Sequence, residues 1–311
     1  MTIDRRTLLA LSGAALVAGC ADPDPQGSGS PTPEGKDAVT VGLTYIPNVQ
    51  FCAFYLGVEE GLFGDLDVTL RHHGEQESLF EALQLGREDI VFASADEAVI
   101  AGGLATVATA YQQYPAEVMV AGRADGLADL RGRTLGIPGR FGSSYYAALA
   151  ALNSAGLTEK DVKLVEIGFT TVTALTTGKV DAVVGFTNNE LVQFQQEGFE
   201  VTSLPVSDEA TLVGPSLITR EDDAKAPWVE QCVQGMLAAE RRAVEDPEAA
   251  LDATAAQVPA LAEPGQRANA KRVLQATSAL WRGDDGELSV DVDAKAMQRM
   301  ETFLREAGIE G

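Results

Sequence analysis

One pattern occurs twice along the chain and constrains the fold more than any other feature. Residues 82–91 and 174–183 both read Ala-Leu, two residues, Gly, two residues, Asp and then an apolar run. In each copy a helix ends at a glycine, Gly86 or Gly178, which suits a left-handed cap because glycine adopts positive φ without steric cost. The apolar run after the aspartate is typical of a buried parallel strand. The pattern therefore predicts two lobes, each built on βαβ units.

The remaining segments continue this alternation of strands and helices. The predicted strands are 39–45, 67–72, 90–93, 107–111, 134–137, 162–167 and 182–186, and the predicted helices include 48–60 and 143–155. From Ala226 onward the chain is mostly helical, with proline breaks. Such alternation indicates an α/β protein with mainly parallel sheets flanked by helices. Ligands of such sheets bind beyond the carboxyl ends of the strands, so polar residues at those ends are the candidate site.

The N-terminal residues predict export and anchoring. Two arginines precede an apolar run at residues 8–17 that is too short to span a bilayer, and Cys20 follows small residues. A cysteine there resembles the bacterial lipobox, whose thiol is acylated; an ordinary signal peptide with an incidental cysteine is the alternative. We expect a signal peptide at 1–19 and a flexible tether at 20–37, rich in Pro, Gly and Ser. The protein would then be lipid-anchored on the extracytoplasmic face of the cell membrane.

Composition disfavours several classes of partner. The formal net charge of -23 on 311 residues repels nucleic acid and anionic lipid headgroups. After Cys20 only Cys52 and Cys232 remain, and His72 and His73, which are adjacent, point to opposite faces of a strand. No ligand spacing typical of a metal site is present, so we expect neither a metal nor a cofactor. The two later thiols are expected to be buried separately, with a disulfide between them as the alternative.

Several blocks between residues 39 and 213 resemble one protein family. These blocks are residues 44–63, 136–143, 167–169, 180–184 and 188–190. They resemble ABC-importer substrate-binding proteins of the family that groups alkanesulfonate-binding with thiamine-pyrimidine-binding members. The first and last blocks are most similar to members that bind thiamine-pyrimidine precursors or riboflavin.

This resemblance implies the type II periplasmic-binding-protein fold, in which two lobes joined by two crossings enclose a small solute. We expect lobe 1 to comprise residues 38–112 and 207–311, and lobe 2 to comprise residues 113–206. It also implies ABC permease subunits as partners of a monomeric binding protein.

Aromatic and amide side chains gather where the first predicted strand leads into a helix. They are Tyr45, Asn48, Gln50, Phe51 and Tyr55. A flat nitrogen heterocycle needs rings to stack on and polar groups that fix its ring nitrogens. Phe51 and Tyr55 stand four residues apart on a helix, so an inward, core position is the alternative for both.

A glycine-bearing loop enters a helix N-terminus in the second half of the chain. Its candidate residues are Gly139, Phe141, Gly142, Ser143, Ser144 and Tyr145. Free backbone N–H groups at a helix N-terminus can meet an anionic or carbonyl oxygen, although many such turns need only glycine and a serine cap. In the resembling family the matching loop lies in the cleft, and Phe141 would supply a stacking face there.

Polar residues at other strand ends complete the candidate site. They are Phe186, Asn188, Asn189 and Glu190 in the second lobe, Ser94 and Asp96 at the equivalent place in the first, and Tyr111 and Gln112 at the crossing. Glu190 would accept from an exocyclic amine or a ring N–H, and a carboxylate favoured by the helix dipole is the alternative. For Tyr111 and Gln112 a plain connector is the alternative.

The predicted function is solute binding rather than catalysis. A pyrimidine synthase with this fold uses a cysteine-rich iron motif and a histidine donor, whereas this chain has no cysteine cluster and has Phe51 near the place of that histidine. We expect the solute-binding component of an ABC importer for a thiamine-pyrimidine precursor or riboflavin. An alkanesulfonate-binding protein and a solute-sensing receptor are the alternatives. Arg140 is the only basic residue of the predicted cleft, which disfavours a strongly anionic solute.

Overall fold

The computed structural model describes residues 36–73, 77–207 and 211–309. The predicted signal peptide, the lipidation site Cys20 and the tether up to residue 35 lie outside these residues. Within the described residues, no helix is long and apolar enough to cross a membrane.

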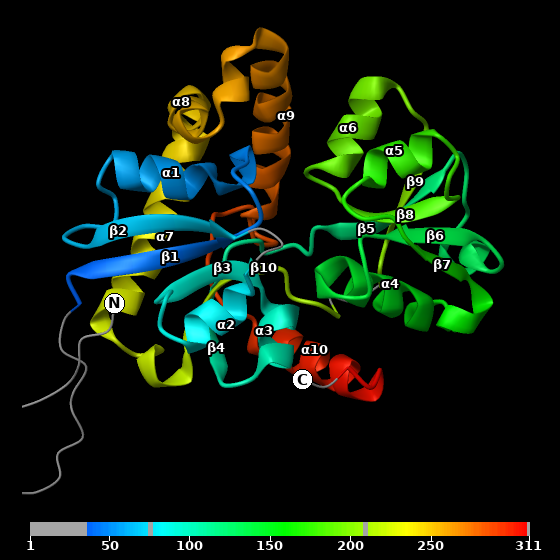
Figure 1. Ribbon diagram of the computed structural model, residues 1–311, viewed down its shortest axis with the longest axis horizontal. Coiled ribbons are helices and arrows are strands. Elements are labelled where there is room, and N and C mark those ends of the chain that lie inside the picture. Colours follow the sequence, from blue (N-terminus) through cyan, green and yellow to red (C-terminus); the bar gives the residue numbers. More distant parts are fainter. Residues whose placement is uncertain (1–35, 74–76, 208–210, 310–311) are drawn as a thin grey trace, which may run out of the picture. The chain divides into compact units, whose positions relative to one another are not determined.

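The first sheet has five strands in the order β2-β1-β3-β10-β4 (Figure 1). These strands are β1 (Ala38–Thr44), β2 (Asp67–His73), β3 (Ile90–Ser94), β4 (Leu104–Thr109) and β10 (Pro215–Arg220). A large apolar core joins one face of this sheet to α1 (Cys52–Glu59), α7 (Pro227–Glu245), α8 (Pro247–Gln257) and α9 (Pro264–Leu280). A smaller core includes apolar residues of α2 (Leu79–Gln84) and α3 (Ala95–Ala101) together with β3 and β10. Helices therefore cover both faces.

The second sheet has five strands in the order β7-β6-β8-β5-β9. These strands are β5 (Ala116–Ala121), β6 (Thr134–Ile137), β7 (Lys163–Glu166), β8 (Ala182–Phe186) and β9 (Val201–Pro205). The core with α4 (Gly142–Ser154) is separate from the core with α5 (Thr171–Thr176) and α6 (Glu190–Glu197). Short 3-10 helices occupy Val49–Phe51, Leu127–Leu130, Glu159–Asp161, Glu221–Asp223 and Pro259–Ala262.

The last helix, α10 (Ala294–Glu306), joins the core that contains α4 and also packs against α3 (red in Figure 1). Its Met300 is fully buried, and the Met300 sulfur accepts from the backbone N–H of Val213 at 3.3 Å. The chain's end thus contacts elements that follow strands of both sheets. The residue bounds of the two lobes stay a prediction.

Both sheets are mixed: four strands of each run in one direction, and one strand, β10 or β5, runs opposite to them. The predicted α/β fold with mainly parallel strands is therefore confirmed, with one reversed strand in each sheet. β1 pairs in parallel with β2 and β3, and β6 with β7 and β8. By contrast, β10 is antiparallel to β3 and β4, and β5 is antiparallel to β8 and β9. The chain reaches β5 from β4 and β10 from β9, directly from the other sheet. The sequence-based expectation rested on strands that alternate with helices along the chain. That pattern gives no information about β5 and β10, which the chain enters from the other sheet.

The repeated sequence pattern has the same structural role in both sheets. The Asp89 Oδ2 accepts from the backbone N–H of Thr40 at 2.9 Å, and the Asp89 N–H donates to the Thr40 carbonyl at 2.9 Å. Asp181 makes the same pair of bonds to Thr134, at 2.8 and 2.9 Å. Each aspartate therefore ties the strand that follows it to the start of the neighbouring parallel strand.

Two predicted elements differ clearly from the observed ones in their bounds. The segment predicted as one helix over 48–60 begins as a 3-10 turn, Val49–Phe51, before α1 starts at Cys52. The Asn48 side chain caps this turn by accepting from Gln50 N. The strand predicted at 107–111 lies earlier, at Leu104–Thr109.

Candidate ligand-binding site

A cavity of about 1210 Å³ lies beyond the carboxyl ends of strands from both sheets. Its lining residues follow β1, β3, β4, β6, β7 and β8, as expected for ligand sites of α/β sheets. Many of the predicted site residues line it. They are Tyr45, Asn48, Gln50, Phe51, Ser94, Tyr111, Phe141, Gly142, Ser143, Ser144, Phe186, Asn189 and Glu190.

Tyr55 does not line the cavity but supports a residue that does. Its ring is 4% exposed in the core of the first sheet, because α1 turns this side chain inward. The Tyr55 hydroxyl lies 2.8 Å from His72 Nε2, and His72 Nδ1 lies 3.0 Å from the Tyr45 carbonyl. The carbonyl can only accept, so Nδ1 carries the proton and Nε2 accepts from the Tyr55 hydroxyl. Burial lowers the pKa of His72, consistent with this neutral tautomer.

Tyr45 has an unusual backbone conformation for a cavity residue. Its φ is 83°, in the left-handed region that non-glycine residues rarely adopt. Strain of this kind persists where the surroundings hold the residue in place, and the hydrogen bond from His72 is one such contact. The turn after β1 thus presents the Tyr45 ring to the cavity.

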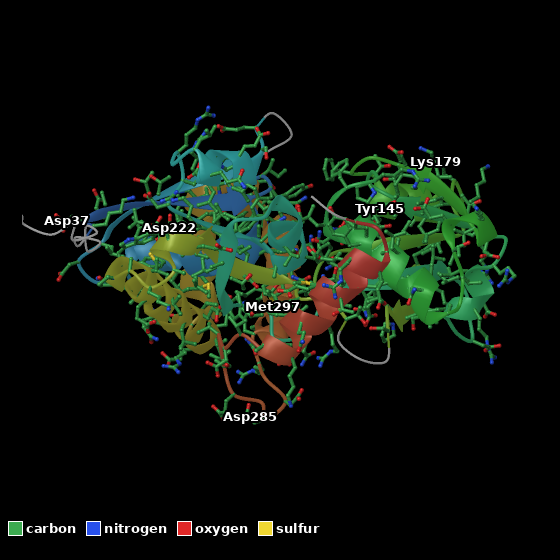
Figure 2. All side chains as sticks on the ribbon, turned by 90° about the horizontal axis from the view of Figure 1, so that it is seen from below. Asp37, Tyr145, Lys179, Asp222, Asp285 and Met297 are labelled. Atoms are coloured by element: carbon green, nitrogen blue, oxygen red, sulfur yellow. The ribbon has the colours of Figure 1, made fainter. Side chains whose placement is uncertain are left out.

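Gly139 and Tyr145 also lie outside the lining. A Cβ atom on Gly139 would come within 2.3 Å of the Phe141 ring, so the glycine leaves room for that cavity residue. Tyr145, labelled in Figure 2, donates from its hydroxyl to Glu159 Oε1 at 2.8 Å. The loop is therefore divided, with Phe141 at the cavity and Tyr145 bonded to Glu159 instead.

Asn188 and Gln112 contact protein rather than the cavity. Asn188 is 1% exposed, and its Nδ2 donates to Thr277 Oγ1 at 2.9 Å and approaches the Tyr111 hydroxyl at 3.5 Å. The Gln112 side chain donates to backbone carbonyls, including that of Asp291 at 3.3 Å. Both side chains therefore form hydrogen bonds with the protein itself. Their positions at strand ends do not indicate these bonds.

Asp96 is fully buried beneath the cavity, whereas its neighbour Glu97 lines it. The Ser143 hydroxyl lies 3.2 Å from Asp96 Oδ1 and 3.0 Å from Glu97 Oε1. The Tyr114 hydroxyl lies 3.3 Å from Asp96 Oδ2. Burial raises the pKa of both carboxyls, and the Glu97 charge raises that of Asp96 further.

Glu190 presents its carboxyl to the cavity from the start of α6. Its Oε2 accepts from Phe186 N at 2.8 Å, and its Oε1 accepts from Asn189 Nδ2 at 3.0 Å. Each carboxylate oxygen has two lone pairs, so both can still accept from a ligand. Burial is the largest cause of a raised pKa of Glu190.

Some large apolar side chains of the lining are buried, such as Phe92, but four are exposed. The exposed ones are Tyr45, 39% exposed, Ile46, 56%, Phe141, 62%, and Phe169, 53%. The Tyr45 and Phe169 rings, which follow strands of different sheets, have centroids 5.7 Å apart at an interplanar angle of 59°. Exposed apolar groups gathered at one cavity mark a binding surface.

The described lining residues include no lysine or arginine. Arg140, the one cation expected in the cleft, instead forms an ion pair with Glu159 outside it. Apart from tyrosines, the lining residues with ionisable side chains are His73, Glu97 and Glu190. His73 Nε2 lies 2.7 Å from the buried Glu88 carboxyl.

The described residues hold no cluster of three His, Cys, Asp or Glu side chains that could bind a metal. Cys52 and Cys232 are free and buried, and burial raises the pKa of each thiol to about 12.

Several lining residues were absent from the predicted set. They include Glu97, Phe169, Thr170, Thr171, Thr173 and Gln193. Phe169 and Thr170 follow β7 directly, so the strand-end rule applied to the predicted strand at 162–167 would have found them. Gln193 lies one helical turn after Asn189 and donates to its Oδ1 at 2.9 Å.

Comparison with known proteins identifies the family. Residues 48–250 match the NMT1/THI5-like family, and the chain belongs to it. The riboflavin-binding protein RibY of Chloroflexus aurantiacus is 30% identical over 323 residues, covering 94% of this chain and 90% of RibY.

Solved structures show the fold. The periplasmic aliphatic sulphonate binding protein SsuA of Escherichia coli superposes with a TM-score of 0.67 at 16% identity, covering 89% of each chain. The desulfurization enzyme DSZB superposes with a TM-score of 0.56 at 16% identity, covering 88% of this chain and 93% of the enzyme. The chain thus has the two-lobe α/β fold of periplasmic binding proteins, as expected from the sequence.

Proposed function

We propose that this protein is the solute-binding component of an ABC importer and that its solute is riboflavin or a related flat nitrogen heterocycle. The 30% identity to riboflavin-binding RibY over nearly the whole chain supports the class of solute. The fold alone cannot separate binding from catalysis, because the desulfurization enzyme shares it. The character of the cavity therefore carries the proposal.

The observation that carries it is an aromatic and acidic lining without lysine or arginine among the described residues. A sulfonate would have to leave water with no cation to pair with, and removing an unpaired ion from water costs several kcal/mol. A neutral heterocycle loses little on entering and gains ring contacts with Tyr45, Phe141 and Phe169. The lining therefore favours a neutral aromatic solute over an alkanesulfonate.

The size of the cavity favours riboflavin over a single pyrimidine ring. Ligand pockets typically measure about 300–1,000 Å³, and this cavity of about 1210 Å³ exceeds that range. A tricyclic ring with a hydroxylated side chain uses far more of such a space than one six-membered ring does. A thiamine-pyrimidine precursor, which offers the same ring and amine chemistry, is the second candidate.

The polar lining suits the edge and side chain of such a solute. Asn189 and Glu190 lie at one strand end, and Asn48 and Gln50 lie at another. Carboxylate and amide oxygens can accept from ring N–H and hydroxyl groups, and amide N–H groups can donate to ring carbonyls. A hydrogen bond to a charged group contributes about 1.5–3 kcal/mol, so Glu190 is the strongest single polar contact proposed.

The cellular location is part of the same proposal and rests on the N-terminal sequence. The N-terminal run ending at Cys20 supports export and lipid anchoring on the extracytoplasmic face, where a binding protein meets its permease. A solute-sensing receptor would use the same cavity with a different membrane partner.

The test is calorimetric titration of the purified protein with riboflavin, the hydroxymethylpyrimidine precursor of thiamine and a short alkanesulfonate. We expect the tightest binding for riboflavin, with quenching of flavin fluorescence by the stacked aromatic rings. Tight sulfonate binding without a response to either heterocycle would overturn the proposal.

A further inference from the structure

A hydrogen-bonded cluster joins α3, which follows a strand of the first sheet, to α4, which follows a strand of the second. Asp96 and Glu97 lie in the first turn of α3, and Ser143 lies in the first turn of α4. The Ser143 hydroxyl contacts Asp96 Oδ1 at 3.2 Å and Glu97 Oε1 at 3.0 Å. The Tyr114 hydroxyl contacts Asp96 Oδ2 and the Ser143 carbonyl, both at 3.3 Å.

The hydrogens available in this cluster are too few if both carboxyls are ionised. Four oxygen–oxygen contacts then depend on two hydroxyl hydrogens, because ionised carboxylates and the carbonyl can only accept. A proton on Asp96 Oδ2 would donate to the Tyr114 oxygen and free the Tyr114 hydrogen for the Ser143 carbonyl. The Ser143 hydrogen goes to Glu97 Oε1, and Asp96 Oδ1 keeps the backbone N–H of Glu97 as its donor at 2.7 Å. One added proton therefore raises the number of these contacts that are made from two to three of the four.

The surroundings provide no positive charge that would remove the need for this proton. The titratable groups that face the two carboxyls are each other, Tyr114 and Tyr146. α10 packs against α3, but within the described part of the chain neither it nor any other element places a lysine, arginine or histidine against Asp96 or Glu97. The dipole of α3 favours ionised carboxyls in its first turn, but Asp96 is 0% exposed and has no charged partner to offset its loss of water.

We propose that Asp96 and Glu97 share a proton when α3 and α4 are in contact, and that the protein takes up this proton as its cavity closes around the solute. The inference rests on the proposed solute-binding function, because it assigns the α3–α4 contact to the closed form. Separation of the first turns of α3 and α4 would let water reach the two carboxyls, which ionise in water at their usual low pKa values.

The sign of the effect follows from proton linkage. The closed form holds more protons than the open form, so solute affinity is highest at low pH and falls as pH rises through the pKa of the closed pair. One linked proton weakens binding by up to tenfold per pH unit within that window. Glu97 also lines the cavity, so the pair connects the proton to the solute itself.

The test uses riboflavin as the probe and calorimetry in buffers of different ionisation enthalpy between pH 5 and 8. The wild-type protein should take up a fraction of a proton per riboflavin bound, and its dissociation constant should rise with pH. Asp96→Asn keeps the shape of the neutral acid and cannot ionise, so it should bind with a much flatter pH dependence. Asp222→Asn, at an exposed site far along the chain, should behave like wild type. Binding without proton uptake, or equal pH slopes in wild type and Asp96→Asn, would overturn the inference.

A second measurement decides the matter if riboflavin does not bind, which would contradict the proposed function alone. A carboxyl that keeps its proton only when folded makes stability fall as pH rises above the usual carboxyl pKa. Urea unfolding of the solute-free protein should therefore show wild type losing stability relative to Asp96→Asn between pH 5 and 8. Parallel stability profiles of the two proteins would refute the shared proton.

Discussion

Asn188 Nδ2 donates a 2.9 Å hydrogen bond to the Thr277 hydroxyl, which joins the turn after β8 to α9. Both side chains are buried, with 1% and 0% of their surfaces exposed. α6 also packs against α9, and Val192 of α6 belongs to the apolar core of the first sheet. Elements that follow strands of different sheets thus meet at a buried, specific contact beside the cavity residue Tyr111.

This contact predicts that Asn188→Ala weakens solute binding although Asn188 does not line the cavity. Loss of one buried hydrogen bond costs about 0.5–1.5 kcal/mol, so the riboflavin dissociation constant should rise about 2- to 12-fold. Gln196→Ala removes an exposed bond to Asn269, between α6 and α9, and should change affinity less. Fluorescence titration of both variants measures the difference, and equal effects would contradict a special role of the buried bond.

The Tyr45–Phe169 ring pair predicts a contribution of Phe169 to binding. Aromatic pairs add about 0.5–1.5 kcal/mol beyond burial, so Phe169→Ala should weaken riboflavin binding about 2- to 12-fold. Phe169 is half exposed, so the fold should keep its stability. Leu85→Ala removes an even more exposed apolar side chain that does not line the cavity. Isothermal calorimetry of the pair should show a loss for the first variant only.

Glu190→Gln should weaken binding of an N–H-bearing heterocycle by about tenfold or more, because a charge-assisted hydrogen bond contributes about 1.5–3 kcal/mol. The new amide can also disturb the bond that Phe186 N now donates to Glu190, so thermal unfolding must accompany the titration. Glu197→Gln makes the same chemical change at an exposed position at the other end of α6. An unchanged affinity of the folded Glu190→Gln protein would remove Glu190 from the site.

The sequence predicted the parts of the fold that depend on local patterns. The repeat around Asp89 and Asp181 indicated two equivalent strand units, and each aspartate makes the same two bonds to a neighbouring strand. The predicted strands did not include β5 or β10, each of which enters its sheet from the other one and runs antiparallel to its neighbours.

The same limit applies to the candidate site. The strand-end rule placed Tyr45 and Glu190 at the cavity, because a residue's place on a strand end depends on the local fold. It could not distinguish Asn189, which lines the cavity, from Asn188, whose amide turns to Thr277 on a helix almost ninety residues later. Contacts between distant segments decide such cases, and no pattern near Asn188 records them.

Cys20→Ser tests the anchoring that the N-terminal sequence predicts. Without the thiol there is no acylation site, so the protein should move from the membrane fraction to the soluble fraction of the cell. Cell fractionation with immunoblotting measures this, and Cys52→Ser, at a buried thiol, is the matched control for membrane attachment. A Cys20→Ser protein that remains on the membrane at the wild-type level would exclude the lipobox.

Gly235 in α7 should be intolerant of alanine although alanine is the better helix former. A Cβ atom there would lie 2.3 Å from the Phe63 ring, which is 3% exposed and also lies within 2.7 Å of the Cβ position of Gly57 in α1. Helix propensity favours alanine over glycine by about 1 kcal/mol, but overpacking a core costs about 1–3 kcal/mol.

Phe63 is confined by α1 and α7 and cannot move aside, so the overpacking cost should exceed the gain in helix propensity. Gly235→Ala should lower the free energy of unfolding by up to about 2 kcal/mol. At Gly265 in the first turn of α9 nothing lies within 4 Å of the Cβ position, so Gly265→Ala should leave stability unchanged or raise it by up to about 1 kcal/mol. Urea unfolding of both variants compares the signs, and a stabilised Gly235→Ala protein would show that the α1–α7 contact can relax around Phe63.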